Sequence, residues 1–168
     1  MPEKKTIERA RQDKHEGKAP TTQAGEFVKE TIEHIRQGKH GARSTKQAIA
    51  IGLSKARRAG VDLPPPEKGK VSAKTRRSAE HAYEKGQHGK TSVSSTRSHA
   101  VVGALKREGT AAASKPALAA QARSAARRRG AADRSAAAQK AVRTKGPAER
   151  SVAARKAART RVRKRTGT

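Results

Sequence analysis

The sequence is poor in the residues that build large cores and reactive sites. It contains no cysteine and no tryptophan, one phenylalanine and one tyrosine, and hydrophobic residues fill only 32% of its 168 positions. The lack of cysteine excludes disulfides and thiolate metal sites. With so few large apolar side chains, little surface is available to offset the entropy of ordering the whole chain. We therefore expect an all-α protein with a small helical core.

Acidic residues are also scarce, and they are unevenly placed. The chain has 41 Lys and Arg against 14 Asp and Glu, a net charge of +27. Residues 1–84 carry 19 basic and 11 acidic side chains (+8), whereas residues 85–168 carry 22 and 3 (+19). A block of like charge repels itself and is typical of a tail that binds a polyanion. Nucleic acid is the expected partner. A membrane is not, because the apolar residues of this half are nearly all Ala.

The segment Ser44 to Gly60, STKQAIAIGLSKARRAG, is the clearest helix in the sequence. Ser44 followed by Gln47 has the spacing of a capping box, and Gly60 is a typical helix stop. Apolar residues recur at helical spacing between them and form one face, with Ile49, Leu53 and Ala56 at its centre. The cations near its end, Lys55, Arg57 and Arg58, stabilise the helix dipole, contact phosphates, or do both.

The run KQAIAIGLSKARRAG (Lys46 to Gly60), preceded by GKHGARS, resembles an uncharacterised family of small, highly basic bacterial proteins that carry a domain of unknown function. The resemblance covers the first third of the chain. It implies a bacterial source and brings no catalytic residues with it.

A second helix is predicted from Ala24 to Gln37, where Val28, Ile32 and Ile35 form an apolar stripe and Gly38 follows as the terminating residue. The short connection to Ser44 predicts a helical hairpin over residues 21–63, which would be marginal alone and is expected to self-associate or bind a ligand. Before it, residues 1–20 form a charged arm. The helix predicted there, Thr6 to Glu16, has little to pack and is expected to fray.

Three consecutive prolines, Pro64 to Pro66, place a linker at residues 64–73. Residues 74–109 then repeat, loosely, several features of the first hairpin: a Glu-His pair, a Gly-x-His-Gly turn, and a Ser-Thr start followed by an apolar run. This loose repeat predicts a degenerate second hairpin, although chance similarity would also explain it.

From residue 110 to 168 the composition turns to Ala, Arg, Lys and Ser, a low-complexity tail. It contains a 16-residue repeat, GAADRSAAAQKAVRTK (130–145) followed by GPAERSVAARKAARTR (146–161). Each unit contains a helix-favouring segment, but these segments are expected to be shorter than the ~12–15 residues at which Ala-rich peptides become helical in water, and they repel themselves. We expect a long, largely disordered tail that becomes partly helical on DNA. In composition it resembles the tails of linker histones and of bacterial histone-like proteins.

These observations predict a nonspecific, architectural DNA-binding protein that neutralises and bridges phosphates, cytoplasmic and associated with the nucleoid. The excess of Arg over Lys in the tail favours forked phosphate contacts and minor-groove insertion. The predicted contacts are Lys39, Arg43, Lys46, Lys55, Arg57, Arg58, Arg123, Arg127, Arg128, Arg129, Lys140, Arg143, Lys145, Arg155, Lys156, Arg159, Arg161, Arg163, Lys164 and Arg165.

Two other functions stay open: RNA binding, including a ribosomal role, and a protein adaptor that docks a partner on the apolar face of Ser44 to Gly60. Base readout by a helix-turn-helix is disfavoured, because the turn is too long. The spacing of the histidines matches no closed zinc site. No nucleophile with a general base beside it indicates a catalytic site. We therefore expect no catalytic residue, no metal ligand and no cofactor.

Overall fold

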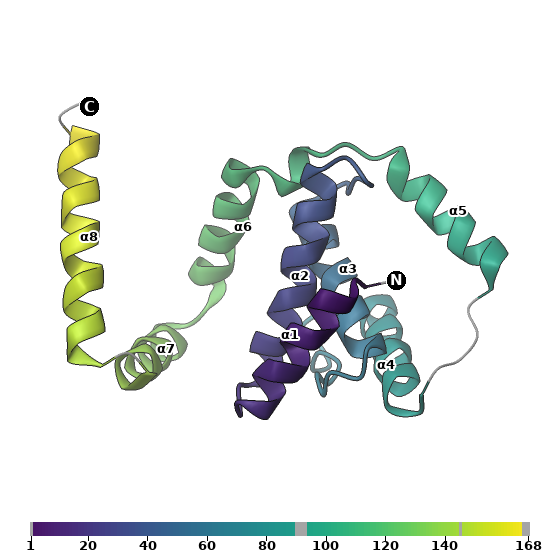
Figure 1. Cartoon of the computed structure of the whole chain (residues 1–168), viewed down its shortest axis with the longest axis horizontal. Helices are drawn as coiled ribbons and strands as arrows, with labels where there is room; N and C mark the ends of the chain where they lie inside the picture. The colour runs from purple at the N-terminus through teal and green to yellow at the C-terminus, as the bar shows by residue number, and fades with distance from the viewer. Residues whose placement is uncertain (1, 90–93, 145, 166–168) are drawn as a thin grey trace. The chain divides into compact units, whose positions relative to one another are not determined.

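The computed structural model describes residues 2–89, 94–144 and 146–165, and it is all-α over these ranges (Figure 1). The helices are α1 (Lys4–His15), α2 (Pro20–Arg36), α3 (Thr45–Arg58), α4 (Ala73–Gln87), α5 (Ser95–Lys106), the 3-10 turn η1 (Ala111–Ala113), α6 (Lys115–Arg128), α7 (Ala131–Thr144) and α8 (Pro147–Arg165). The chain divides into two compact units, Met1–Gln121 and Ala122–Thr168. The predicted all-α class is confirmed.

Helices α2 and α3 form the predicted pair and are the centre of the first unit. The Ser44 hydroxyl accepts a hydrogen bond from the Gln47 amide, and the Gln47 side chain accepts one from the backbone of Arg43, so the capping box closes one residue earlier than expected. Gly38, with φ of +71°, ends α2 as the sequence predicts. A Cβ on Gly52 would lie 2.6 Å from the Val28 Cα, so the two backbones touch at this point.

Helix α1 packs on α2 and is not a frayed arm. Ala10 is buried in one hydrophobic cluster with Phe27, the only phenylalanine of the chain, and Ile7 packs against it. The same cluster includes Val61, and Leu63 covers its edge. The helix is therefore fixed by a small apolar contact, which its charged composition concealed.

A second cluster joins the other end of the pair to residues far along the chain. Ile35, Ala42 and Ala48 are buried against Ala112 and Ala113 of η1. The Thr45 hydroxyl donates to the Ala112 carbonyl (2.7 Å), and Arg36 Nε donates to the Ala113 carbonyl (2.9 Å). Residues 111–113, predicted to begin the tail, thus complete the core.

Helices α4 and α5 form in the region of the predicted second hairpin, but they differ in their contacts. Helix α4 packs on α3, where a Cβ on Gly86 would overlap the Arg57 carbonyl, and its Ala79 and Ala82 are buried. Helix α5 has no buried residue, and its end meets the α2–α3 turn where the Gly41 amide donates to the Leu105 carbonyl (2.8 Å). Helix α4 therefore extends the first hairpin.

The prediction of a long disordered tail is wrong. Over the described part of residues 110–168 the chain forms η1, α6, α7 and α8. Helix α8 has 19 residues, because it continues past the end of the repeat at 161, and this length exceeds the ~12–15 residues needed for an Ala-rich helix in water. Ala, Arg, Lys and Gln are also among the strongest helix formers. Helix propensity therefore outweighs the repulsion between the cations.

Candidate nucleic-acid interface

The two copies of the 16-residue repeat become helices α7 and α8 in the same way. The carbonyls of Gly130 and Gly146 accept the first helical hydrogen bonds, from the amides of Arg134 and Arg150, each at 3.1 Å. An acidic residue lies in the first turn of each helix, where its negative charge interacts favourably with the positive end of the helix dipole. The repeat thus encodes a helix start followed by a cationic helix body.

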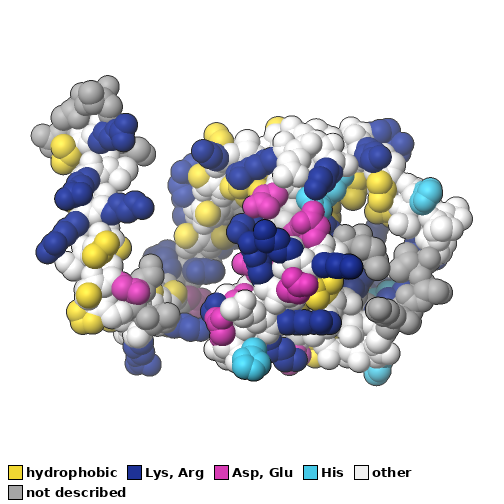
Figure 2. All heavy atoms as spheres, viewed as in Figure 1, with side chains coloured by type: hydrophobic (Ala, Val, Ile, Leu, Met, Phe, Trp, Pro, Cys, Tyr) yellow, Lys and Arg dark blue, Asp and Glu magenta, His cyan; other side chains and the backbone are white. Residues whose placement is uncertain are grey.

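The second unit presents its cations to solvent. Residues 122–168 contain 16 Lys and Arg but only Asp133 and Glu149 as acids, a net charge of +14. Every described residue in 126–143 and 146–163 is exposed, and Figure 2 shows Lys and Arg side chains projecting from this part of the surface. The predicted contacts on exposed positions here are Arg123, Arg127, Arg128, Arg129, Lys140, Arg143, Arg155, Lys156, Arg159, Arg161 and Arg163. Lys145 and the side chains of Lys164 and Arg165 lie outside the described residues.

Two exposed cations of this unit, Arg134 and Arg150, are missing from the predicted set. Each directly follows the acid of its repeat, which makes the local charge look neutral. Their shared position in the two copies was the available signal, because a repeated helix repeats its exposed face. The Arg134 guanidinium donates to the Arg129 carbonyl at 3.2 Å and so closes the end of α6.

Arg57, one of the predicted phosphate contacts, is not displayed on the surface. It is buried, with 6% of its surface exposed, and its guanidinium donates to the carbonyls of Leu63 (3.0 Å) and Pro64 (3.2 Å). Burial lowers the pKa of its guanidinium. Arg57 therefore holds the proline segment against α3, a role that the pattern of cations at a helix end does not reveal.

The other predicted cations of the first unit fall into two groups. Lys55 donates to the buried Glu30 carboxylate (3.1 Å), and Lys39 lies 3.5 Å from Glu3, so both are engaged within the chain. Arg43, Lys46 and Arg58 occupy exposed positions at the two ends of α3. Of the three helix-end cations, Lys55 and Arg57 thus form tertiary contacts within the chain, and Arg58 is exposed and stays a predicted phosphate contact.

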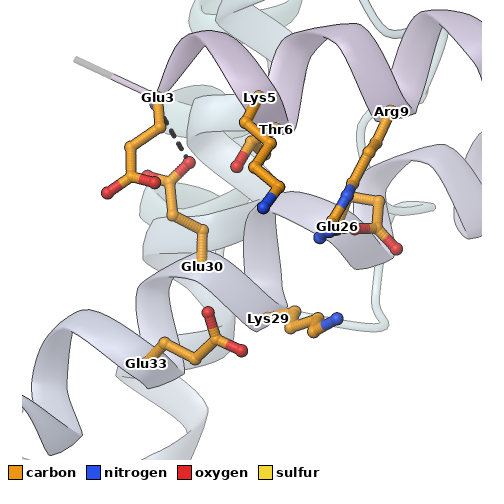
Figure 3. Close-up of a pocket in the computed structure, with 8 residues that line it drawn as sticks. All are labelled: Glu3, Lys5, Thr6, Arg9, Glu26, Lys29, Glu30 and Glu33. Carbon is orange, nitrogen blue, oxygen red and sulfur yellow. Dashed lines mark hydrogen bonds and ion pairs between the residues drawn. The ribbon is translucent and has the colours of Figure 1, made fainter.

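A hollow of about 300 Å³ lies between α1 and α2 and is lined by both charge types (Figure 3). Glu30 lies at its base, where its carboxylate accepts a hydrogen bond from the Glu3 amide (3.1 Å) as well as from Lys55. Glu3 in turn lies 2.7 Å from His34 Nε2, and Arg9 lies 3.6 Å from Glu26. These charged side chains pair with one another, and the pairs link α1 to the hairpin. The hollow therefore does not concentrate one sign of charge.

Two carboxyl groups of this cluster have lowered pKa values. Burial alone would raise the pKa of Glu30, but hydrogen bonds from Thr6, the Glu3 backbone and Lys55 outweigh it, and the net shift is downward. The hydrogen bond from His34 lowers the pKa of the exposed Glu3. Both groups are thus held in the charged form that fixes the N-terminus to α2.

Residues 11–68 match the model of a family of unknown function (DUF6496). The match covers about a third of the chain and includes α2, α3 and the Lys46 to Gly60 segment, consistent with an uncharacterised domain at the hairpin. No curated protein and no solved structure matches the chain. Within the described ranges, no helix has the length and apolar character needed to cross a membrane, and no group of three or more His, Cys, Asp or Glu residues is arranged to hold a metal ion.

Proposed function

We propose that this protein is a nonspecific, architectural DNA-binding protein that acts on the nucleoid by neutralising and bridging phosphates. The observation that carries the proposal is the second unit: a net charge of +14 over residues 122–168, with the cations displayed on exposed helices. A surface of this kind gains binding free energy by releasing the counterions condensed on DNA, without reading base sequence.

The acids are concentrated in the first unit. There several cations pair with carboxylates, as Lys55 does with Glu30 and Lys18 with Asp13 (2.7 Å), although residues 1–121 still carry a net charge of +13. In the second unit two acids face sixteen cations, so most of its charge is available to an external polyanion. The first unit adds exposed cations at the ends of α3, and two linked cationic units can occupy two segments of DNA at once.

Duplex DNA is favoured over single strands because stacking platforms are missing. Proteins that bind single strands stack the bases on aromatic side chains. Phe27 is buried, with 1% of its surface exposed, and the hydroxyl of Tyr83, the other aromatic residue, donates to Asp62 at 2.6 Å. The alternative is RNA binding through phosphates alone, which is tested by comparing the affinities for duplex DNA and duplex RNA.

The adaptor alternative is less favoured, because part of the apolar face of α3 on which it rests is covered. Helix α3 packs against both α2 and α4, while Ile49 and Leu53 stay partly exposed. Ala48 and Ala56, on its apolar side, are fully buried.

The test is binding of the full chain to matched 30-base-pair duplexes of DNA and RNA, and to single strands, across a salt series. Contacts with ~6–10 phosphates predict a loss of about 10³–10⁵ in affinity between 50 and 200 mM salt. Two variants with equal charge change separate the units. One neutralises Arg150, Arg155, Lys156, Arg159 and Arg161 of α8 to Gln, and the other neutralises Lys4, Lys5, Arg11, Lys14 and Lys29 of α1 and α2.

We expect the α8 variant to lower the salt slope by about 4 and the control variant to change it by less than 1, because each phosphate contact contributes ~0.9 to the slope. Unrelated DNA sequences should bind equally. Tighter binding to RNA than to DNA, or equal effects of the two variants, would remove the support for this function.

A further inference from the structure

The cations of α8 lie on two opposite sides of the helix. At about 100° per residue, Arg161 lies within roughly 20° of Arg150 around the helix axis. Arg155, Lys156 and Arg159 lie about 140–240° away from Arg150, on the far side. Figure 2 shows basic side chains projecting on both sides of this helix. A helix that rested on one row of phosphates would need its cations on one side only.

The two faces between these cationic sides carry small residues. One holds Ala153 and Thr160, and the other holds Ser151 and Ala158, with Val162 toward its edge. The helix is therefore broad and charged in one direction across its axis and narrow in the other. Such a cross-section suits a groove whose two walls are phosphate backbones and whose floor must be approached closely.

The size of the helix selects the groove. An α-helix with its side chains is ~10–12 Å across, which fits the ~12 Å major groove of B-DNA but not the ~6 Å minor groove. The major groove of A-form RNA is too deep and narrow for side chains to read. A membrane surface is disfavoured, because α8 has no continuous apolar face to bury.

We propose that α8 binds in the major groove of duplex DNA, with Arg150 and Arg161 on one phosphate wall and Arg155, Lys156 and Arg159 on the other. This inference rests on the proposed DNA-binding function and replaces the minor-groove insertion expected for a disordered Arg-rich tail. The small residues face the floor of the groove and form no base-specific hydrogen bonds, so the binding is indifferent to sequence.

The first experiment blocks one groove at a time, with the full chain and one duplex sequence at constant salt. In one duplex every cytosine is replaced by glucosylated 5-hydroxymethylcytosine, which fills the major groove. In another, netropsin occupies the minor groove of the A·T steps. We expect the glucosylated duplex to bind at least tenfold more weakly and netropsin to change the affinity less than twofold.

Two kinds of variant then test the helix itself. Ala157→Pro keeps every charge but breaks α8 at its centre, and it should abolish the discrimination against glucosylated DNA. The pairs Arg150→Gln/Arg161→Gln and Arg155→Gln/Arg159→Gln remove two cations from one side each. If both walls are contacted, each pair lowers the salt slope by about 2.

The outcomes separate the two proposals. Equal binding to glucosylated and plain DNA, competition by netropsin, or an effect of only one pair would overturn the groove assignment and leave nonspecific DNA binding in place. A chain that binds none of the duplexes with a salt-dependent affinity, or binds duplex RNA or anionic vesicles more tightly, overturns the proposed function and this inference with it.

Discussion

Alanine at position 52 should destabilise the first unit, although the same change at a neighbouring helical glycine should stabilise it. Gly52 faces α2, where a Cβ would lie 2.6 Å from the Val28 Cα and 2.9 Å from both its amide nitrogen and its Cγ2. Gly25 lies inside α2, and a Cβ there would meet nothing within 4 Å. The two sites therefore differ in packing and share the same gain in helix propensity.

The magnitude follows from these two terms. Alanine in place of glycine inside a helix gains ~0.8–1 kcal/mol. At position 52 the nearest atom belongs to the backbone and must retreat by roughly 0.8 Å to restore an ordinary contact of 3.4 Å. Overpacking of this kind costs ~1–3 kcal/mol. We expect Gly52→Ala to lose up to ~2 kcal/mol of unfolding free energy and Gly25→Ala to gain ~0.8–1 kcal/mol.

Tyr83 provides the assay. It is the only tyrosine in a chain without tryptophan, and it lies on α4, which packs directly on α3. Its fluorescence in urea reports the first unit alone, free of any signal from the tail helices. At about 4 °C per kcal/mol for a domain near 100 residues, the melting temperatures of the two variants should move in opposite directions by several degrees. If Gly52→Ala stabilises as much as Gly25→Ala, the close approach of α2 and α3 is refuted.

Three further predictions concern the charged and polar groups of the first unit. Arg57→Lys should lower the unfolding free energy by ~1.5–3 kcal/mol, since a lysine cannot donate to two carbonyls in a fixed fork, and it should leave the salt slope of DNA binding unchanged. A change in the slope without loss of stability would restore Arg57 as a phosphate contact. The lowered pKa of Glu30 stabilises the fold above the unfolded value near 4.5, and this stability is lost as the pH falls through the folded value. Glu30→Gln should therefore be destabilising at pH 7 and approach the wild type in urea unfolding as the pH falls below the unfolded value, and a difference that does not depend on pH would contradict the assignment. The hydrogen bond to Asp62 raises the pKa of Tyr83 above 10. Absorbance at 295 nm should show this titration shifting down in Asp62→Asn, and an unchanged midpoint would show that the contact is not formed.

The parts of the fold that could be predicted from the sequence are those encoded over a few residues. Ser44 with Gln47 marks the start of α3, and Gly38 marks the end of α2, because capping and a positive φ depend on local chemistry. The contacts of Ala112 and Ala113 with the hairpin could not be predicted in this way. They join residues some 67 positions apart, as Thr45 and Ala112 are, and a run of alanines looks alike in a core and in a tail.

The candidate site was predicted in its composition but not in its geometry. A count of charges finds the cationic half, yet it ranks buried Arg57 with exposed Arg58, because burial depends on the carbonyls of a loop six residues away. In the tail, the length of the repeat unit, which ends at residue 161 in the second copy, predicts a segment too short to be helical alone. The helix continues to Arg165, and those added residues bring α8 past the length at which an Ala-rich helix is stable in water.

The difference between a disordered tail and a helical one matters for the proposed binding to DNA. A disordered cationic chain must lose conformational entropy when it binds and can follow either groove, whereas a preformed helix has already lost that entropy and fixes the direction of each cation. Ala157→Pro separates these two modes at constant charge, so it tests whether the order of the tail, and not its charge alone, determines the groove that the proposed DNA binding occupies.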